Sequence, residues 1–84
     1  MTNCRLVLIE WLDSRRPDPD WKFIGDVANA SPVKCASVGW LLRDDEVKVL
    51  CPNMGDLDME NPQGCGLIEI PAGCVSKVTS LAEA

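Results

Sequence analysis

The sequence of 84 residues predicts one small, mainly β domain in which five short antiparallel strands close into a barrel. Apolar residues alternate in several short runs, a period that is typical of strands. Prolines, glycines and acidic residues interrupt these runs, which suits turns between strands. Closure is expected because a closed barrel leaves no exposed strand edge.

The first expected strand spans residues 5–12 (RLVLIEWL). Both of its sides are apolar, with Leu6 and Leu8 on one side and Val7, Ile9 and Trp11 on the other. In so small a chain, a strand that is apolar on both sides indicates either a closed barrel or a subunit interface.

Residues 15–20 (RRPDPD) are expected to form a loop, because their two prolines cannot continue a strand or a helix. Asp20 is then placed to cap a short helix over residues 21–28. Trp21, Ile24 and Ala28 would share one face of that helix. Gly25 weakens helix formation, so an irregular or extended segment remains the alternative.

The second expected strand spans residues 33–42, and a tight turn at Asp44 and Asp45 leads into a third strand over residues 47–51. Gly39 within the second strand indicates a bend or a bulge. The two sides of this strand differ: Ala36, Val38, Trp40 and Leu42 lie on one, and Cys35, Ser37 and Gly39 on the other.

A long polar loop is expected over residues 52–64, followed by a fourth strand over residues 66–70 with Ile68 and Ile70 pointing inward. Residues 71–73 (PAG) form a turn. A last short strand, entered through a 3₁₀ turn, is then marked by Val75, Val78 and Leu81.

The segment IPAGCVSKVTSL, residues 70–81, resembles the turn and final strand of SH3-like and Sm-like barrels. The segments IEWLDS, SVGWLLRDDEVKVLC and GLIEIPAGCVSKVTSL are together similar to small uncharacterised proteins encoded by tailed bacteriophages. The resemblance implies a bacteriophage or prophage origin and no established activity. The long loop and the cysteines are not part of the shared pattern.

Composition disfavours several classes of function. The net charge is −5, from 13 acidic and 8 basic residues, whereas nucleic-acid binding relies on clustered Lys and Arg. The chain has no histidine, which excludes Ser–His and Cys–His catalytic pairs. Cys65, between two glycines, is the best candidate for a reactive thiol, but no base accompanies it. We therefore expect no enzymatic activity and no direct contact with nucleic acid.

Neither a membrane segment nor a bound metal is expected. No run approaches the ~18 apolar residues of a membrane span, and the N-terminal run lacks the features of a signal peptide, so we expect a cytoplasmic protein of the bacterial host. The five cysteines show no C-x-x-C spacing and suit reduced thiols, with Cys35 and Cys51 as buried apolar residues. The acids after residue 55 do not match a calcium loop, because Asn61 and Leu67 occupy its glycine and glutamate positions.

Two groups of residues are the candidates for contact with other molecules. Trp11 and Trp40 lie in apolar strand patterns and are expected in the core, whereas Trp21 beside the proline-rich loop is expected to be a partly exposed interface residue. Acidic side chains at the hairpin tip and in the long loop would meet a basic surface: Asp44, Asp45, Glu46, Asp56, Asp58 and Glu60.

These residues lead to two functional hypotheses. The first is a non-enzymatic, phage-encoded accessory protein that binds a host protein, such as a nucleic-acid-processing complex, through an acidic and aromatic surface. An inhibitor of a bacterial defence system, for example an anti-CRISPR protein, belongs to this class. The alternative is a homo-oligomeric barrel that binds or sequesters a small nucleotide, with Arg15, Arg16 and Trp21 gripping phosphate and base.

Overall fold

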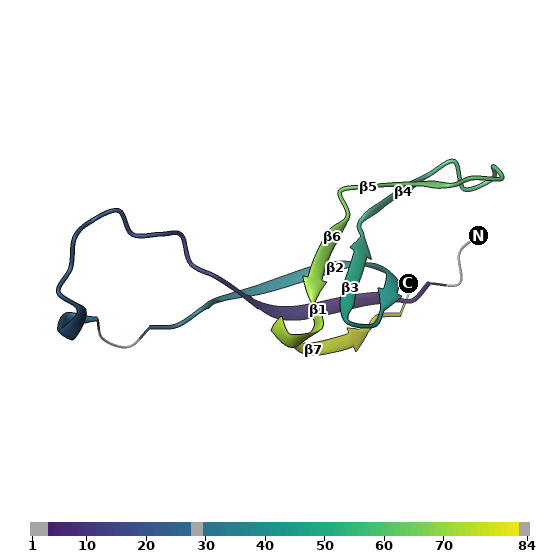
Figure 1. Ribbon diagram of the computed structural model, residues 1–84. Helices are drawn as coiled ribbons and strands as arrows, with labels where there is room; N and C mark the ends of the chain where they lie inside the picture. The colour runs from purple at the N-terminus through teal and green to yellow at the C-terminus, as the bar shows by residue number, and fades with distance from the viewer. Residues whose placement is uncertain (1–3, 28–29, 83–84) are drawn as a thin grey trace.

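The computed structural model describes residues 4–27 and 30–82, which form β-strands, two 3₁₀ turns and connecting segments (Figure 1). The strands are β1 (Leu6–Asp13), β2 (Val33–Asp44), β3 (Val47–Cys51), β4 (Asn53–Gly55), β5 (Gln63–Cys65), β6 (Ile68–Pro71) and β7 (Val75–Ser80). The 3₁₀ turns are η1 (Ile24–Asp26) and η2 (Ala72–Cys74). Within the described residues, no helix has the length and apolar character needed to cross a membrane.

Five strands form one antiparallel sheet in the order β6-β3-β2-β1-β7, and β4 and β5 form a separate two-stranded sheet. The expected mainly β fold with five antiparallel strands is therefore confirmed. The expected closure is not observed, because the edge strands β6 and β7 do not pair with each other and are joined through η2. The Ala72 amide of η2 donates to the Glu46 carbonyl at 2.9 Å, which continues the pairing of β3 with β6 beyond Val47 and Pro71.

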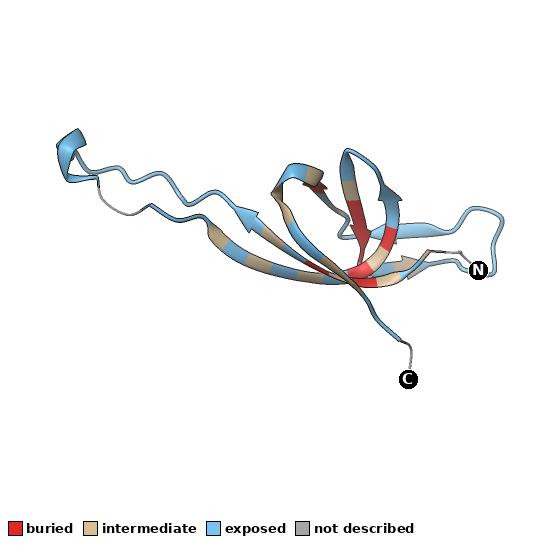
Figure 2. Cartoon of the chain, turned by 90° about the horizontal axis from the view of Figure 1, so that it is seen from below, coloured by how far each residue is buried: buried red, intermediate tan, exposed pale blue. Residues whose placement is uncertain are grey.

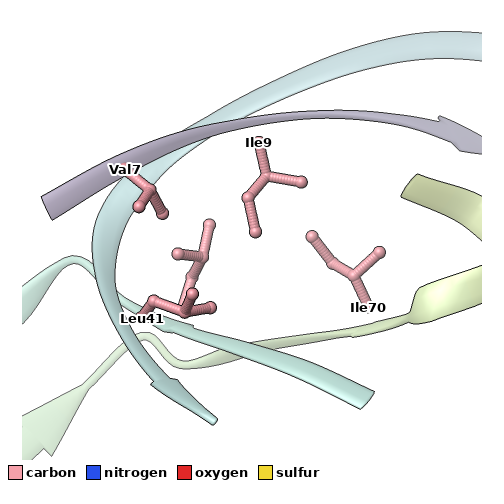
Figure 3. Close-up of a cluster of buried hydrophobic side chains, with 5 residues drawn as sticks. Val7, Ile9, Leu41 and Ile70 are labelled. Atoms are coloured by element: carbon pink, nitrogen blue, oxygen red, sulfur yellow. The ribbon is translucent and has the colours of Figure 1, made fainter. Parts of the chain in front are cut away.

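The core is a small cluster of aliphatic side chains on the inner side of the bent sheet: Val7, Ile9, Leu41, Leu50 and Ile70 (Figure 3). These residues come from β1, β2, β3 and β6, so the cluster joins strands that are distant in sequence. Trp11 packs against the cluster, as expected. Its indole Nε1 donates a hydrogen bond to Ser37 Oγ at 3.0 Å, which satisfies the polar group of a half-buried ring.

The two sides of β2 are placed opposite to what their apolar character suggests. Leu41 and Gly39 are buried on the core side of β2. Trp40 and Val38 lie on the outer side, where they pair across the ladder with Leu6 and Leu8. The prediction that Trp40 belongs to the core is therefore wrong, because Trp40 is not among the residues that pack against the cluster. Gly39 marks a close approach of two strands, and the bulge of β2 lies further on, between Leu41 and Arg43.

Three further expectations need correction. The helix over residues 21–28 is replaced by η1, a single 3₁₀ turn whose N-cap is Phe23 and which has no side-chain cap from Asp20; Ala28 lies outside the described residues. The polar loop over residues 52–64 contains the β4–β5 ladder. The last strand ends at Ser80, one residue before Leu81, and is entered through η2 as expected.

Candidate protein-interaction site

A long arm, residues 14–32, connects β1 to β2 and projects from the sheet (Figure 1). With the arm at one end and the β4–β5 hairpin at the other, the molecule measures 58 × 24 × 23 Å. Pro17 and Pro19 prevent the start of the arm from pairing as a strand. At its base, Arg15 holds the two sides together, because its Nε donates to the Ser31 carbonyl oxygen at 2.6 Å.

The tip of the arm carries large apolar side chains that are almost fully exposed. Trp21 is 102% exposed, Ile24 is 90% exposed and Phe23 is 83% exposed, and Val27 is also open to solvent. We call these four residues the arm tip. Figure 2 shows that the described residues of the arm are exposed, whereas the buried residues lie in the bent sheet. Exposed apolar clusters of this kind are typical of surfaces that bind another macromolecule.

Acidic residues surround the arm tip. Lys22 forms an ion pair with Asp18, and this hydrogen bond, together with one from the Asp20 amide, lowers the pKa of Asp18. Asp20 and Asp26 make no ion pair within the described residues. The arm tip therefore combines apolar rings with two uncompensated carboxylates and one neutralised pair.

The acids of the β2–β3 turn are mostly neutralised by the protein's own bases. Asp44 forms ion pairs with Lys48 and Arg5, and Asp45 pairs with Arg43 at 3.0 Å. The pKa of Asp44 is lowered chiefly by the Lys48 hydrogen bond, and that of Asp45 chiefly by the Arg43 hydrogen bond. Among the predicted acids of this turn, only the Glu46 side chain makes no ion pair in the described part of the chain.

The lowered pKa values of Asp44 and Asp45 predict a specific dependence of stability on pH. A carboxyl whose pKa is lower in the folded state stabilises the fold above its unfolded pKa, and this contribution is lost as pH falls through the folded pKa. We expect the Tm, followed by circular dichroism, to fall below about pH 4. Asp44→Asn should be less stable than the native chain at pH 7, and this deficit should become smaller as the pH falls from about 4 to about 2. An equal deficit at both pH values would contradict this assignment.

The other predicted acids lie at the tip of the β4–β5 hairpin. Asp56, Asp58 and Glu60 are exposed there and make no ion pair within the described residues. Met59 between them is 65% exposed, and its amide donates to the Asp56 carbonyl in the turn. No group of acids, cysteines or histidines able to hold a metal ion occurs in the described ranges 4–27 and 30–82. The hairpin tip and the arm lie at opposite ends of the molecule (Figure 1).

Arg15, Arg16 and Trp21 do not form one pocket. Arg15 lines an open hollow at the base of the arm with Ser31 and Pro32, whereas Trp21 lines a separate hollow with Lys22, Phe23 and Asp26. Arg16 is exposed and lines neither hollow. The guanidinium of Arg15 is already engaged by both the carbonyl and the hydroxyl of Ser31.

The thiols have different environments. Cys51 is fully buried, in agreement with its expected role as a small apolar residue, and Cys35 is half-buried. Cys65, the candidate reactive thiol, is exposed on β5. The described cysteines are all free.

Sequence reasoning predicted that Trp21 is partly exposed, but it did not include the exposed apolar neighbours Phe23 and Ile24. The helical spacing of Trp21, Ile24 and Ala28 predicted one shared helix face, whereas the structure has only the 3₁₀ turn η1 at Ile24–Asp26. A usable signal was present, because a helix confined between Pro19 and Pro32 is only marginally stable unless it packs on the sheet, and Gly25 weakens it further.

The chain matches no protein-family model, no curated protein and no solved structure.

Proposed function

We propose that this protein is a non-enzymatic binding protein that attaches to a partner protein through the arm tip. The observation that carries the proposal is the exposure of Trp21, Phe23 and Ile24 at the end of an arm that has no role in the core. Aromatic side chains are enriched among the residues that dominate binding energy at protein interfaces. An arm that projects from the sheet can reach a recessed surface on a larger protein.

The charges around the arm tip indicate the chemistry of the partner. Asp20 and Asp26 make no ion pair in the described part of the chain, so a partner with basic residues around an apolar pocket would complement them. Nucleic-acid-processing proteins commonly expose such basic surfaces. The acids of the β2–β3 turn contribute less than the sequence suggested, because their own bases already neutralise them.

The origin of the partner follows from the resemblance to bacteriophage proteins. A phage-encoded chain acts in the cytoplasm of a bacterium, so the partner would be a host protein, and a component of a defence system is the leading class. The presence of five antiparallel strands in one sheet supports an SH3-like or Sm-like architecture, and so does the 3₁₀ turn η2, which leads from β6 into the last strand β7. In this proposal the bent sheet is a scaffold, and the arm carries the recognition.

The test is capture of a partner from bacterial lysate by the immobilised native chain, followed by an affinity measurement. Trp21→Ala is expected to weaken binding at least about tenfold, because truncating a dominant interface aromatic costs about 2 kcal/mol or more. Met59→Ala, at the other end of the molecule, truncates a similarly exposed apolar side chain and should leave binding unchanged. Equal binding by Trp21→Ala and the native chain, or no captured host protein at all, would exclude the proposal.

A second proposal is a homo-oligomer that binds a small nucleotide. The open hollow at the base of the arm favours it, because Arg15 there presents a guanidinium beside the Ser31 hydroxyl, and such groups bind phosphate. A nucleotide that binds the folded state should raise the Tm by mass action, and Arg15→Ala should abolish the increase. The affinity of Trp21→Ala for a captured protein then distinguishes the two proposals.

A further inference from the structure

The outer side of the β1–β2 ladder is apolar and has no covering element in the described chain. Its members come from alternating positions of the two strands. Leu6 pairs with Trp40 and Leu8 with Val38, whereas Leu12 and Ala36 lie further along the same side, where their ladder partners are Lys34 and Glu10. Val38 is 53% exposed and Leu12 is 38% exposed. We call these six residues the outer apolar face.

We propose that a second copy of this chain covers the outer apolar face, and that the two copies pack this face against each other around a twofold axis. The first argument is the inverted pattern of β2. The strand turns Ser37 and Gly39 towards the core and Val38 and Trp40 towards solvent. In the monomer this arrangement leaves apolar side chains on the outer side without a cover, and such a surface lowers solubility unless another molecule covers it.

The second argument is the small size of the core. Seven hydrophobic residues are buried in the described chain, whereas twelve large hydrophobic residues are exposed. A domain of this length buries a smaller fraction of its surface than larger domains do, and association is one of the ways in which small chains gain stability. The outer apolar face supplies a contiguous surface for such association, and the arm tip is separate from it.

The third argument is that the outer side carries charged side chains of both signs, which favours self-association over a partner whose surface is uniformly basic or uniformly acidic. Glu10, Lys34 and Lys77 lie on the same outer side, as the ladder pairs of Glu10 with Lys77 and of Leu12 with Lys34 show. These three side chains make no ion pair within the described residues. A uniformly basic or acidic partner would leave one sign opposed by a like charge, whereas a second copy of this face offers both signs.

The expected assembly is a closed dimer of modest affinity. A twofold axis makes the contact isologous, so each copy uses the same face and no further copies are recruited. Six apolar side chains in each copy form a contact at the low end of specific interfaces, which predicts a dissociation constant in the micromolar range. The arm tips remain free, so this inference does not depend on the proposed partner.

Sedimentation velocity over about 1–300 µM tests the proposal directly, because a micromolar dissociation constant places the transition in this range. The native chain should shift from monomer to dimer. Val38→Glu should weaken dimerisation at least about tenfold, because it places a charge in an apolar contact. Val38→Ser is a milder second variant, and the circular-dichroism spectrum of each variant shows whether it is folded.

Val27→Glu makes the same substitution, with the same change in net charge, on the arm tip. It should leave the dimer intact while it weakens capture of the partner, so failure of one proposal is distinguishable from failure of the other. A native chain that stays monomeric across the range would overturn the dimer proposal. Undiminished dimerisation of folded Val38→Glu and Val38→Ser, or loss of the dimer in Val27→Glu alone, would also overturn it.

Discussion

Ile9→Ala is expected to lower the free energy of unfolding by about 2–5 kcal/mol, because it removes three carbon atoms from a site that cannot collapse around the loss. Ile9 is fully buried and is among the largest of the fully buried side chains in the described chain. It lies in a core cluster of only five buried residues, so few neighbours remain to fill the cavity. Domains of this size are stable by only about 4–13 kcal/mol, so the variant should be close to unfolding at 37 °C.

Urea denaturation followed by tryptophan fluorescence measures this loss. Ile24→Ala is the matched control, since it makes the same chemical change at a residue that is 90% exposed on the arm. Its expected effect on the free energy of unfolding is below about 0.5 kcal/mol. Equal losses for the two variants would mean that the cluster around Ile9 is not the core of the fold.

The strands were predictable from sequence because their apolar alternation reflects real differences in burial. In β6, Ile70 is buried and Ile68 half-buried while Glu69 is exposed, as the pattern predicts. In β1, apolar residues on both sides indicated either closure or an interface. In the structure Val7 and Ile9 are buried, whereas Leu6 and Leu8 are half-buried on the outer side of a sheet that does not close.

The inward side of β2 was not predictable from hydrophobicity. A rule that buries the more apolar side selects Val38 and Trp40, yet the core receives Gly39 and Leu41. The physical reason is the close approach of β2 and β3 at the bend, where no side chain fits on the inner side. Hydrophobicity measures what a residue gains by burial, whereas this position is decided by the space available.

The connections were the least predictable parts. The arm has the residues of an amphipathic helix but too few of them between prolines, so a single 3₁₀ turn forms instead. The residues of β4 and β5 carry no apolar alternation, and their ladder joins short polar segments at the end of β3. The exposure of Trp21 was predictable because a tryptophan beside a proline-rich loop has no strand to join.

Ion pairs neutralise most of the acidic residues of the β2–β3 turn, which a count of charges along the sequence does not reveal. A count of charges along the sequence separates Arg5 from Asp44, whereas the fold places their side chains 3.4 Å apart. An ion pair between two strands cannot be predicted unless the register of those strands is known. For the acids of the β4–β5 hairpin, a count of charges along the sequence agrees with the structure, because β4 and β5 contain no basic residue that could pair with them.

Gly39→Ala is the second substitution with a large expected effect. A Cβ atom at this position would lie 2.9 Å from the carbonyl oxygen of Cys51 and 3.1 Å from its carbonyl carbon. Both atoms belong to the backbone of β3, so the contact cannot be relieved by rotation of a side chain. The two strands must separate, and overpacking of this kind costs about 1–3 kcal/mol of unfolding free energy. Thermal and urea unfolding should both show the loss.

Gly25→Ala separates this steric effect from the general effect of replacing glycine. A Cβ atom at Gly25 meets nothing within 4 Å, and neither glycine has a positive φ angle. Replacing a glycine without strain restricts the unfolded chain and stabilises a protein by about 0.4–1 kcal/mol. The two substitutions should therefore shift stability in opposite directions. A stabilising effect of Gly39→Ala would mean that β2 and β3 do not approach as closely at the bend as Gly39 and Cys51 indicate, and the reason for the inverted faces of β2 would be lost with it.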